Sequence, residues 1–169
     1  MQTIGILGGS FNPVHVGHVM LASYLSQYTS LDAVWLTLSP CNPLKNTDAF
    51  VADEHRLAML QLAVESVPNA DVCDIELSLP RPSYTIKTLD TLKEQYPEKQ
   101  FRLVIGSDNW LIFDKWKDYQ RIIADYGVVV YPRPGYEIEE INTPGVEFVN
   151  APVINLSSTF IREGYIAGK

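Results

Sequence analysis

Two histidines stand close together in this sequence, three residues apart and shortly behind a pair of glycines. They are His15 and His18, and a spacing of three at the start of a helix places both rings on one side. Gly8 and Gly9 follow a short apolar stretch and allow the backbone to approach a ligand closely. Ser10 and the amides after it can donate hydrogen bonds to phosphate oxygens. These residue types in this order indicate a phosphate-binding turn with two imidazole rings beside it.

Simpler explanations of these residues stay open. The glycine pair fits neither G-x-x-x-x-G-K-[ST] nor G-x-G-x-x-G, so a tight strand-to-helix turn would also account for it. The histidines could be structural, or they could be two zinc ligands. The only other histidine is His55, and no cysteine or histidine follows at ligand spacing. We therefore expect no protein-bound metal ion.

A second segment near the C-terminus has the residue types that bind an anion. Ser157, Ser158 and Thr159 are three consecutive hydroxyl residues, which commonly cap helices. The free amides at a helix start can bind a negative charge, and Arg162 lies one turn later, within reach of the same charge. Taken alone, such a cluster is more often a simple helix cap.

The composition is that of a folded single domain over residues 1–169, with 46% hydrophobic and 20% charged residues. The net charge of −7 argues against a nucleic-acid partner, because surfaces that bind nucleic acids are basic. The sequence contains neither an apolar run long enough for a membrane span nor a secretory signal, so we expect no membrane partner. Cys41 and Cys73 form no close motif, which is typical of a reduced cytoplasmic protein.

Strand-like and helix-like patterns alternate along the chain. The segments expected to form strands are 3–7, 33–38, 72–77, 101–105, 127–131 and 147–149. The segments expected to form helices are 17–28, 53–67 with Asp53 as N-cap, 84–95, 118–125 and one that begins near Ser158. This order predicts an α/β fold with a doubly wound, mostly parallel sheet and helices on both faces.

Ligands of such sheets bind beyond the carboxyl ends of the strands, near the point where the strand order reverses. The loops expected at those ends are 8–10, 39–40, 106–108 and 132–133. An anionic ligand would need local cations or helix N-termini there, because the overall charge of the protein repels it.

The two end segments together resemble the motifs G-G-[ST]-F-[DN]-P-x-H-x-G-H and S-S-T-x-x-R of a nucleotidyltransferase superfamily. The resemblance implies a Rossmann-like fold, ATP as a substrate and a histidine pair that stabilises the transition state. It implies catalytic roles for His15, His18 and Arg162, and for Lys45 in a P-x-x-P-x-[KR] loop in which Leu44 replaces the usual histidine. The implied ATP-binding residues are Gly8, Gly9, Ser10, Phe11, Gly106, Asp108, Arg133, Ser157, Ser158 and Thr159.

The middle of the chain resembles the bacterial nicotinate-nucleotide adenylyltransferases in particular. Residues 82–89 match their P-S-Y-T-x-x-T-L motif, and Trp116 follows the Asp of a G-x-D sequence by eight residues, as in that family. A tryptophan suits stacking with a flat pyridine ring, and donors at a helix start suit the carboxylate of that ring. The implied acceptor-binding residues are Ser83, Tyr84, Thr85, Trp116 and Lys117. Trp35 and Trp110 lack such a motif and are expected in the core.

The resemblance implies adenylyl transfer from ATP to nicotinate mononucleotide, a step of NAD biosynthesis that gives deamido-NAD and pyrophosphate. Mg²⁺ is expected, bound mainly through the ATP phosphates, since no carboxylate cage is evident. Nicotinamide mononucleotide or phosphopantetheine as the acceptor stays open, as does a nucleotide-binding sensor on the same fold. Also open are a homo-oligomeric state and the reason why the sequence stops at Lys169, whereas members of the family generally continue with a C-terminal helical tail.

Overall fold

The computed structural model describes residues 1–40 and 51–169. Its centre is a six-stranded sheet in the order β3-β2-β1-β4-β5-β6, in which every pair of neighbouring strands is parallel. The strands are β1 Thr3–Gly9, β2 Ala33–Leu38, β3 Ala70–Cys73, β4 Gln100–Gly106, β5 Val128–Tyr131 and β6 Val146–Phe148. The chain fills one half of the sheet from β1 to β3 and then crosses to β4 on the other side of β1. The predicted doubly wound α/β fold is therefore confirmed.

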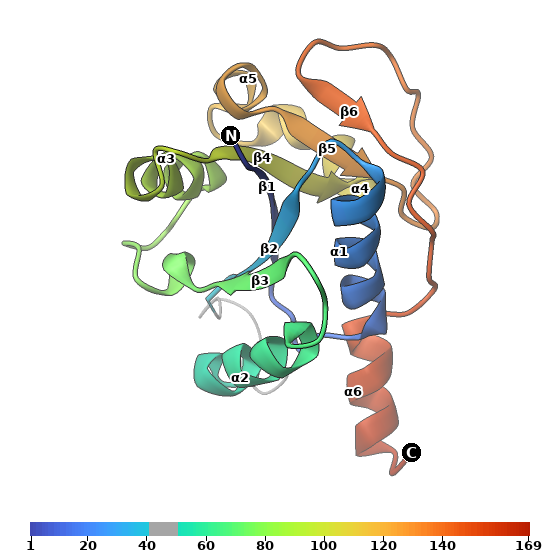
Figure 1. Cartoon of the computed structure of the whole chain (residues 1–169). Coiled ribbons are helices and arrows are strands. Elements are labelled where there is room, and N and C mark those ends of the chain that lie inside the picture. Colours follow the sequence, from blue (N-terminus) through green and yellow to red (C-terminus); the bar gives the residue numbers. More distant parts are fainter. Residues whose placement is uncertain (41–50) are drawn as a thin grey trace.

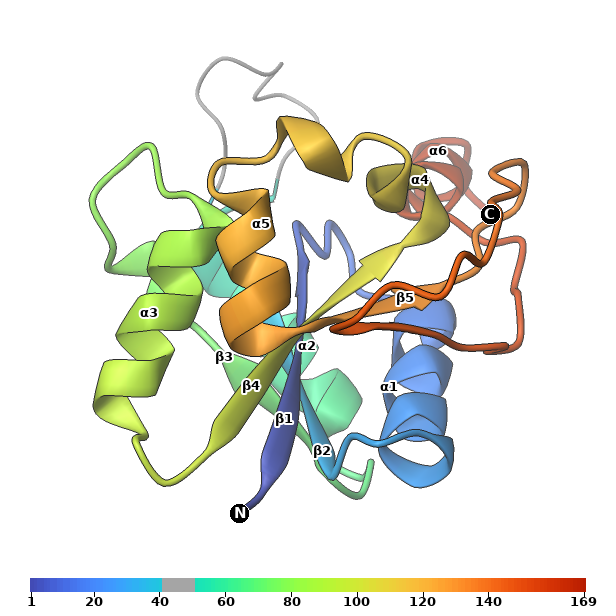
Figure 2. The same cartoon turned by 90° about the horizontal axis from the view of Figure 1, so that it is seen from above.

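Helices cover both faces of the sheet, as Figures 1 and 2 show. The longer helices are α1 Val16–Tyr28, α2 Asp53–Val64, α3 Thr85–Gln95 and α6 Ser158–Ile166. The shorter ones are η2 Ile75–Leu77, α4 Ser107–Trp110, η3 Phe113–Lys115, α5 Tyr119–Arg121 and the π-helical η4 Ile122–Tyr126.

Each face of the sheet has its own apolar core, because successive strand residues point to opposite faces. Ile4 and Ile6 of β1 pack with α3 and η4, where Leu89 and Ile122 are fully buried. Leu7 of β1 packs instead in the cluster that contains Leu25 of α1. Trp35 and Trp110 lie partly buried against the first core, as expected. The two cores fix β1 between helices on both sides, so its glycine-rich end is held in place.

Three local expectations differ from the structure. The predicted strand 72–77 ends at Cys73, because Asp74 leaves the extended conformation (φ −108°, ψ 13°) and Ile75 turns into the core. Helix α2 ends at Val64, and its N-cap is Ala52; Asp53 is the first helical residue and pairs with Arg56. The predicted helix 118–125 consists of two short pieces, α5 and η4.

No helix in the described part of the chain is long and apolar enough to cross a lipid bilayer.

Candidate active site

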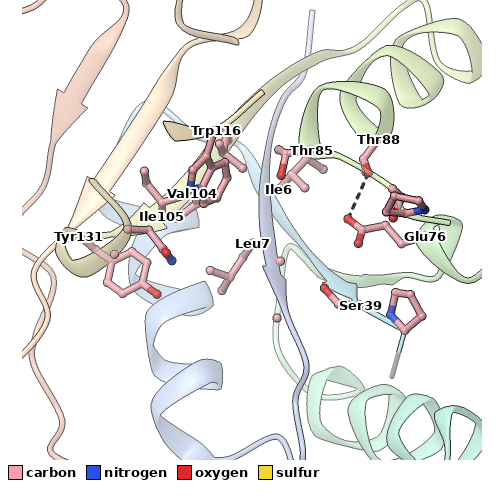
Figure 3. Close-up of a pocket in the computed structure, with 18 of the residues that line it drawn as sticks. Ile6, Leu7, Ser39, Glu76, Thr85, Thr88, Val104, Ile105, Trp116 and Tyr131 are labelled. Atoms are coloured by element: carbon pink, nitrogen blue, oxygen red, sulfur yellow. Dashed lines mark hydrogen bonds between the residues drawn. The ribbon is translucent and has the colours of Figure 1, made fainter. Parts of the chain in front are cut away.

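A cavity of about 780 Å³ lies at the carboxyl ends of β1 and β4, where the strand order reverses (Figure 3). This is the place that the sequence predicts for a ligand. Residues from three of the four predicted loops line the cavity: Gly8, Gly9, Ser39, Pro40 and Gly106. Two glycines at the end of β1 keep this part of the wall free of bulky side chains, so a ligand can approach the backbone.

The far wall of this cavity holds residues predicted to bind the acceptor. Ser83 and Thr85, at the start of α3, and Trp116 line it. A smaller cavity of about 270 Å³ continues beyond these three and is also lined by Tyr84 and Lys117. The Lys117 ammonium lies 4.6 Å from the centre of the Tyr84 ring, a cation–π contact. The first turn of α3 contains no acidic residue, and the side chain of its N-cap residue, Tyr84, makes no capping hydrogen bond. The start of α3 and the Lys117 ammonium therefore place positive charge at the end of the cavity next to Trp116.

A third cavity, of about 330 Å³, brings together the two ends of the chain. Its walls include His15 and His18 of the N-terminal motif, Ser157 and Ser158 of the C-terminal motif, and Arg133. In Figure 1, α6 begins close to the start of α1. These five residues supply nitrogen and hydroxyl donors suited to phosphate oxygens, and the rest of the lining includes apolar residues such as Leu21 and Val153.

The two histidines are fixed by the backbone of the helix that they begin. His15 is the N-cap of α1, and its Nδ1 accepts a hydrogen bond from the Gly17 N–H at 3.1 Å. The Nδ1 of His18 accepts one from the His15 N–H at 3.0 Å. A neutral imidazole whose Nδ1 is an acceptor carries its proton on Nε2. Both rings can therefore donate a hydrogen bond to a ligand through Nε2.

The surroundings of the histidines keep both rings neutral. Burial lowers the pKa of His18 to about 3, assisted by the nearby His15 and Arg133. Burial and Arg133 also lower the pKa of His15. The rings stack with their centres 3.7 Å apart, and the buried Phe11 meets the His18 ring edge-on at 4.9 Å. Phe11 thus packs against a candidate catalytic ring.

The start of α6 is bound directly to the turn after β1. The Ser158 hydroxyl donates to the carbonyl of Pro13 at 2.7 Å, and Arg162 donates to the carbonyl of Asn12 at 2.6 Å. Ser157 caps the helix by accepting the Phe160 N–H. Thr159 accepts a hydrogen bond from Arg162. Neither Thr159 nor Arg162 lines one of the three cavities; Arg162 joins the two motifs, and Thr159 contacts Arg162.

Gly106, Asp108 and Arg133 meet at the end of β4. A Cβ atom on Gly106 would lie 2.5 Å from Asp108 Oδ1 and 2.6 Å from Arg133 Cγ, so only glycine allows this approach. Asp108 Oδ1 is buried and has no hydrogen-bond partner among the described residues. A buried carboxylate oxygen without a donor is costly, which is consistent with a ligand that donates to it.

The loop after β1 is held from below by a fully buried arginine. Arg56 donates to the carbonyls of Ser10 and Ser39, and its Nε donates to Val51 at 3.0 Å. Ser10 itself is exposed and lines none of the three cavities. Lys45, expected to be catalytic, lies outside the described residues.

Glu76 and Tyr131 are among the lining residues that were not predicted from the sequence. Glu76 lies in the wall of the cavity of about 780 Å³ and accepts a hydrogen bond from the Thr88 hydroxyl at 3.2 Å (Figure 3). Burial raises the pKa of this carboxyl. Tyr131 lines both this larger cavity and the histidine cavity. Its place at the end of a predicted strand, two residues before Arg133, was the one available signal.

Comparison with known proteins places the chain among nucleotidyltransferases. The cytidylyltransferase-like family model matches residues 6–164. A curated "Probable nicotinate-nucleotide adenylyltransferase" of Bacteroides fragilis is 49% identical over 166 residues, which cover 98% of this chain and 83% of the relative. One of the same name from Azobacteroides pseudotrichonymphae is 45% identical over 98% and 88% of the two chains.

A solved structure has the same fold. It is the Plasmodium falciparum nicotinic acid mononucleotide adenylyltransferase complexed with NaAD, with a TM-score of 0.79 and 21% identity, covering 96% of this chain and 83% of that one. Because the sequence identity is only 21%, this similarity shows a shared fold and nothing more. Together with the full-length match to curated relatives, these findings show that the chain belongs to the cytidylyltransferase-like family.

Proposed function

We propose that the protein is a nicotinate-nucleotide adenylyltransferase, which transfers the adenylyl group of ATP to nicotinate mononucleotide and releases pyrophosphate. The observation that carries the proposal is the meeting of two differently built cavities at the carboxyl edge of the sheet. One holds Trp116 and the start of α3, and the other holds His15, His18 and Arg133. The names of the curated relatives support the same reaction.

The acceptor site combines an aromatic ring with positive charge. Trp116 offers an aromatic face to the pyridine ring, and the N–H groups at the start of α3, with Lys117 nearby, offer a positive field to its carboxylate. Nicotinamide mononucleotide carries an uncharged amide in place of that carboxylate and gains less from this field. Phosphopantetheine has no aromatic ring to stack. The charge and the ring together favour nicotinate mononucleotide.

The new bond joins the acceptor phosphate to the α-phosphorus of ATP. A phosphate oxygen of nicotinate mononucleotide attacks the α-phosphorus of ATP, the bond between that phosphorus and the bridging oxygen breaks, and pyrophosphate leaves with that oxygen. The attacking oxygen is already an anion, so no general base is needed. Catalysis then depends on positioning and on donors for the phosphate oxygens. His15 and His18 donate through Nε2, and Arg133 supplies positive charge beside them.

The remaining predicted groups have supporting roles in this proposal. Gly8, Gly9 and Gly106 give the nucleotide access to the backbone, and Asp108 accepts from a hydroxyl of its ribose. Arg162 and Ser158 hold the turn of the first motif in place, while Ser157 presents the start of α6 to the phosphates. Lys45 stays a prediction for the leaving pyrophosphate.

Magnesium is proposed to enter with ATP. Among residues 1–40 and 51–169, no group of three or more His, Cys, Asp or Glu side chains is placed to hold a metal ion. The donors of the histidine cavity are imidazole N–H, guanidinium and hydroxyl groups, which fit phosphate and not a divalent cation. The ion would therefore be held by ATP phosphates and water, where it would neutralise phosphate charge. A reduced cytoplasmic location is proposed as well, in keeping with the free, buried Cys73.

The proposed reaction can be tested with ATP that carries a label at either the α- or the γ-phosphorus. ATP labelled at the α-phosphorus should transfer its label to a dinucleotide when nicotinate mononucleotide is present, while ATP labelled at the γ-phosphorus should release the label as pyrophosphate. Transfer of the γ-label to the acceptor, or binding of ATP without any release, would contradict adenylyl transfer.

A further inference from the structure

Tyr131 occupies a position that no other described residue shares. It is the only residue in the described parts of the chain that lines both the cavity with Trp116 and the cavity with His15 and His18. It ends β5 and lies in register beside Gly106 of β4, at the edge of the sheet where both cavities open. In Figure 3 its ring stands at the border of the larger cavity, with the hydroxyl on the side of Leu7.

The border between the two cavities is where the two substrates must meet. This step rests on the proposed function, which places the acceptor ring at Trp116 and the ATP phosphates at the histidines. The acceptor phosphate and the α-phosphate have to come into contact for the bond to form. A side chain that belongs to both walls is therefore beside the reacting phosphorus.

The hydroxyl of Tyr131 is prepared to act as a donor. The nearby Arg133 partly offsets the effect of burial on the pKa of Tyr131, and because a guanidinium can only donate, the hydroxyl oxygen is the acceptor in any hydrogen bond with Arg133. The proton of the hydroxyl stays free for a ligand. Burial raises the pKa of Tyr131, so this proton is kept at neutral pH.

We propose that Tyr131 is a further catalytic residue, whose hydroxyl donates a hydrogen bond to a non-bridging oxygen of the α-phosphate as the adenylyl group is transferred. Charge builds up on these oxygens during transfer, and a donor fixed in a half-buried wall stabilises it without having to reorganise. The hydroxyl keeps its proton throughout. The His15 and His18 Nε2 donors come from the start of α1, so Tyr131 adds a donor from β5.

The test is the substitution Tyr131→Phe, which removes the hydroxyl and keeps the ring. We expect kcat with nicotinate mononucleotide to fall roughly 10- to 100-fold, because a single transition-state donor is lost. KM for both substrates should change by less than about threefold, since the ring still fills the wall. The melting temperature should stay close to that of the wild type. Tyr24→Phe, which changes a tyrosine of α1 that lines none of the three cavities, should leave kcat unchanged.

A second comparison separates direct action from action through Arg133. In an Arg133→Met background, Tyr131→Phe should still lower kcat by the same factor. If the effect of Tyr131→Phe disappeared in that background, the hydroxyl would act only by holding Arg133, and the inference would be overturned.

The activity of the wild type shows whether a negative result contradicts this inference alone or the proposed function as well. An active wild type with an equally active Tyr131→Phe variant would overturn this inference alone. A wild type that released no pyrophosphate with any acceptor would overturn the proposed function, and this inference with it.

Discussion

The Nδ1 atom of His18 accepts the backbone N–H of His15 at 3.0 Å, so one candidate catalytic ring caps the helix start formed by the other. The two rings also stack 3.7 Å apart. One nitrogen of each ring is thereby occupied by the backbone, and the other is left to donate. The structural and chemical explanations of the histidine pair, which the sequence leaves as alternatives, are both compatible with this geometry.

Two substitutions can separate the catalytic role of His18 from its role as a helix cap. His18→Ala should lower turnover about 10²- to 10³-fold, because a phosphate donor is lost, and should also cost about 1 kcal/mol of stability, because the cap is lost. Glutamine at this third helical position can accept the same backbone N–H, as in a capping box. His18→Gln should therefore regain the melting temperature while turnover stays at least about tenfold below the wild type. His55→Ala, at an exposed histidine of α2, serves as the control. Near-normal turnover of His18→Ala would refute the catalytic role.

The low pKa of His18 predicts a pH dependence of stability. The folded pKa of about 3 lies below the ordinary value of 6.5, so the unfolded chain binds a proton in that range and the folded protein does not. The contribution of His18 is complete above pH 6.5 and is lost as the pH falls toward 3, by about 1.4 kcal/mol per pH unit. Denaturant unfolding of the wild type between pH 7.5 and about pH 5 should thus show a steeper loss than His18→Gln. Equal slopes would contradict the burial of a neutral ring.

Trp116 is expected to act in binding and not in the chemical step. Trp116→Ala should raise KM for nicotinate mononucleotide by about tenfold or more with little change in kcat, because it removes a stacking surface. Trp116→Phe should restore most of the loss, since a smaller aromatic face remains. Steady-state kinetics at saturating ATP measures both. An unchanged acceptor KM in the alanine variant would mean that the ring only packs against Phe113, its neighbour at 5.1 Å.

The half-buried carboxyl of Glu76 predicts that stability depends on pH in the opposite direction. Its folded pKa is raised by burial, partly offset by hydrogen bonds from Thr88 and Ser39. A raised carboxyl pKa means that stability is complete below the unfolded value and is lost as the pH rises through the folded value. Glu76→Gln keeps an oxygen acceptor for Thr88 without the charge. The variant should melt at least as high as the wild type at pH 8, whereas a lower melting temperature at that pH would contradict this account.

The large-scale features of the fold could be predicted from the sequence because they follow from local patterns. The apolar strands, the helical spacing and the glycine-rich turns each act over a few residues, and their order determines the doubly wound sheet. The strand end at Cys73 escaped prediction because a tertiary contact, the burial of Ile75, ends the alternation there.

The sequence motifs account for some of the residues that line the cavities, and tertiary packing adds others. Ser157 and Ser158 reach the histidine cavity as expected, but Arg162 turns to a carbonyl of the first motif, a contact between residues 150 positions apart. Glu76 comes to the cavity from η2, and Tyr131 comes from the end of β5. No spacing along the chain encodes such a contact.

The most direct measurement is pyrophosphate release from ATP and Mg²⁺ with three acceptors compared side by side: nicotinate mononucleotide, nicotinamide mononucleotide and phosphopantetheine. The positive start of α3 and the ring of Trp116 predict strong release with nicotinate mononucleotide and weaker release with nicotinamide mononucleotide. Phosphopantetheine should give none. Release with phosphopantetheine alone, or ATP binding without release for every acceptor, would contradict the proposed function.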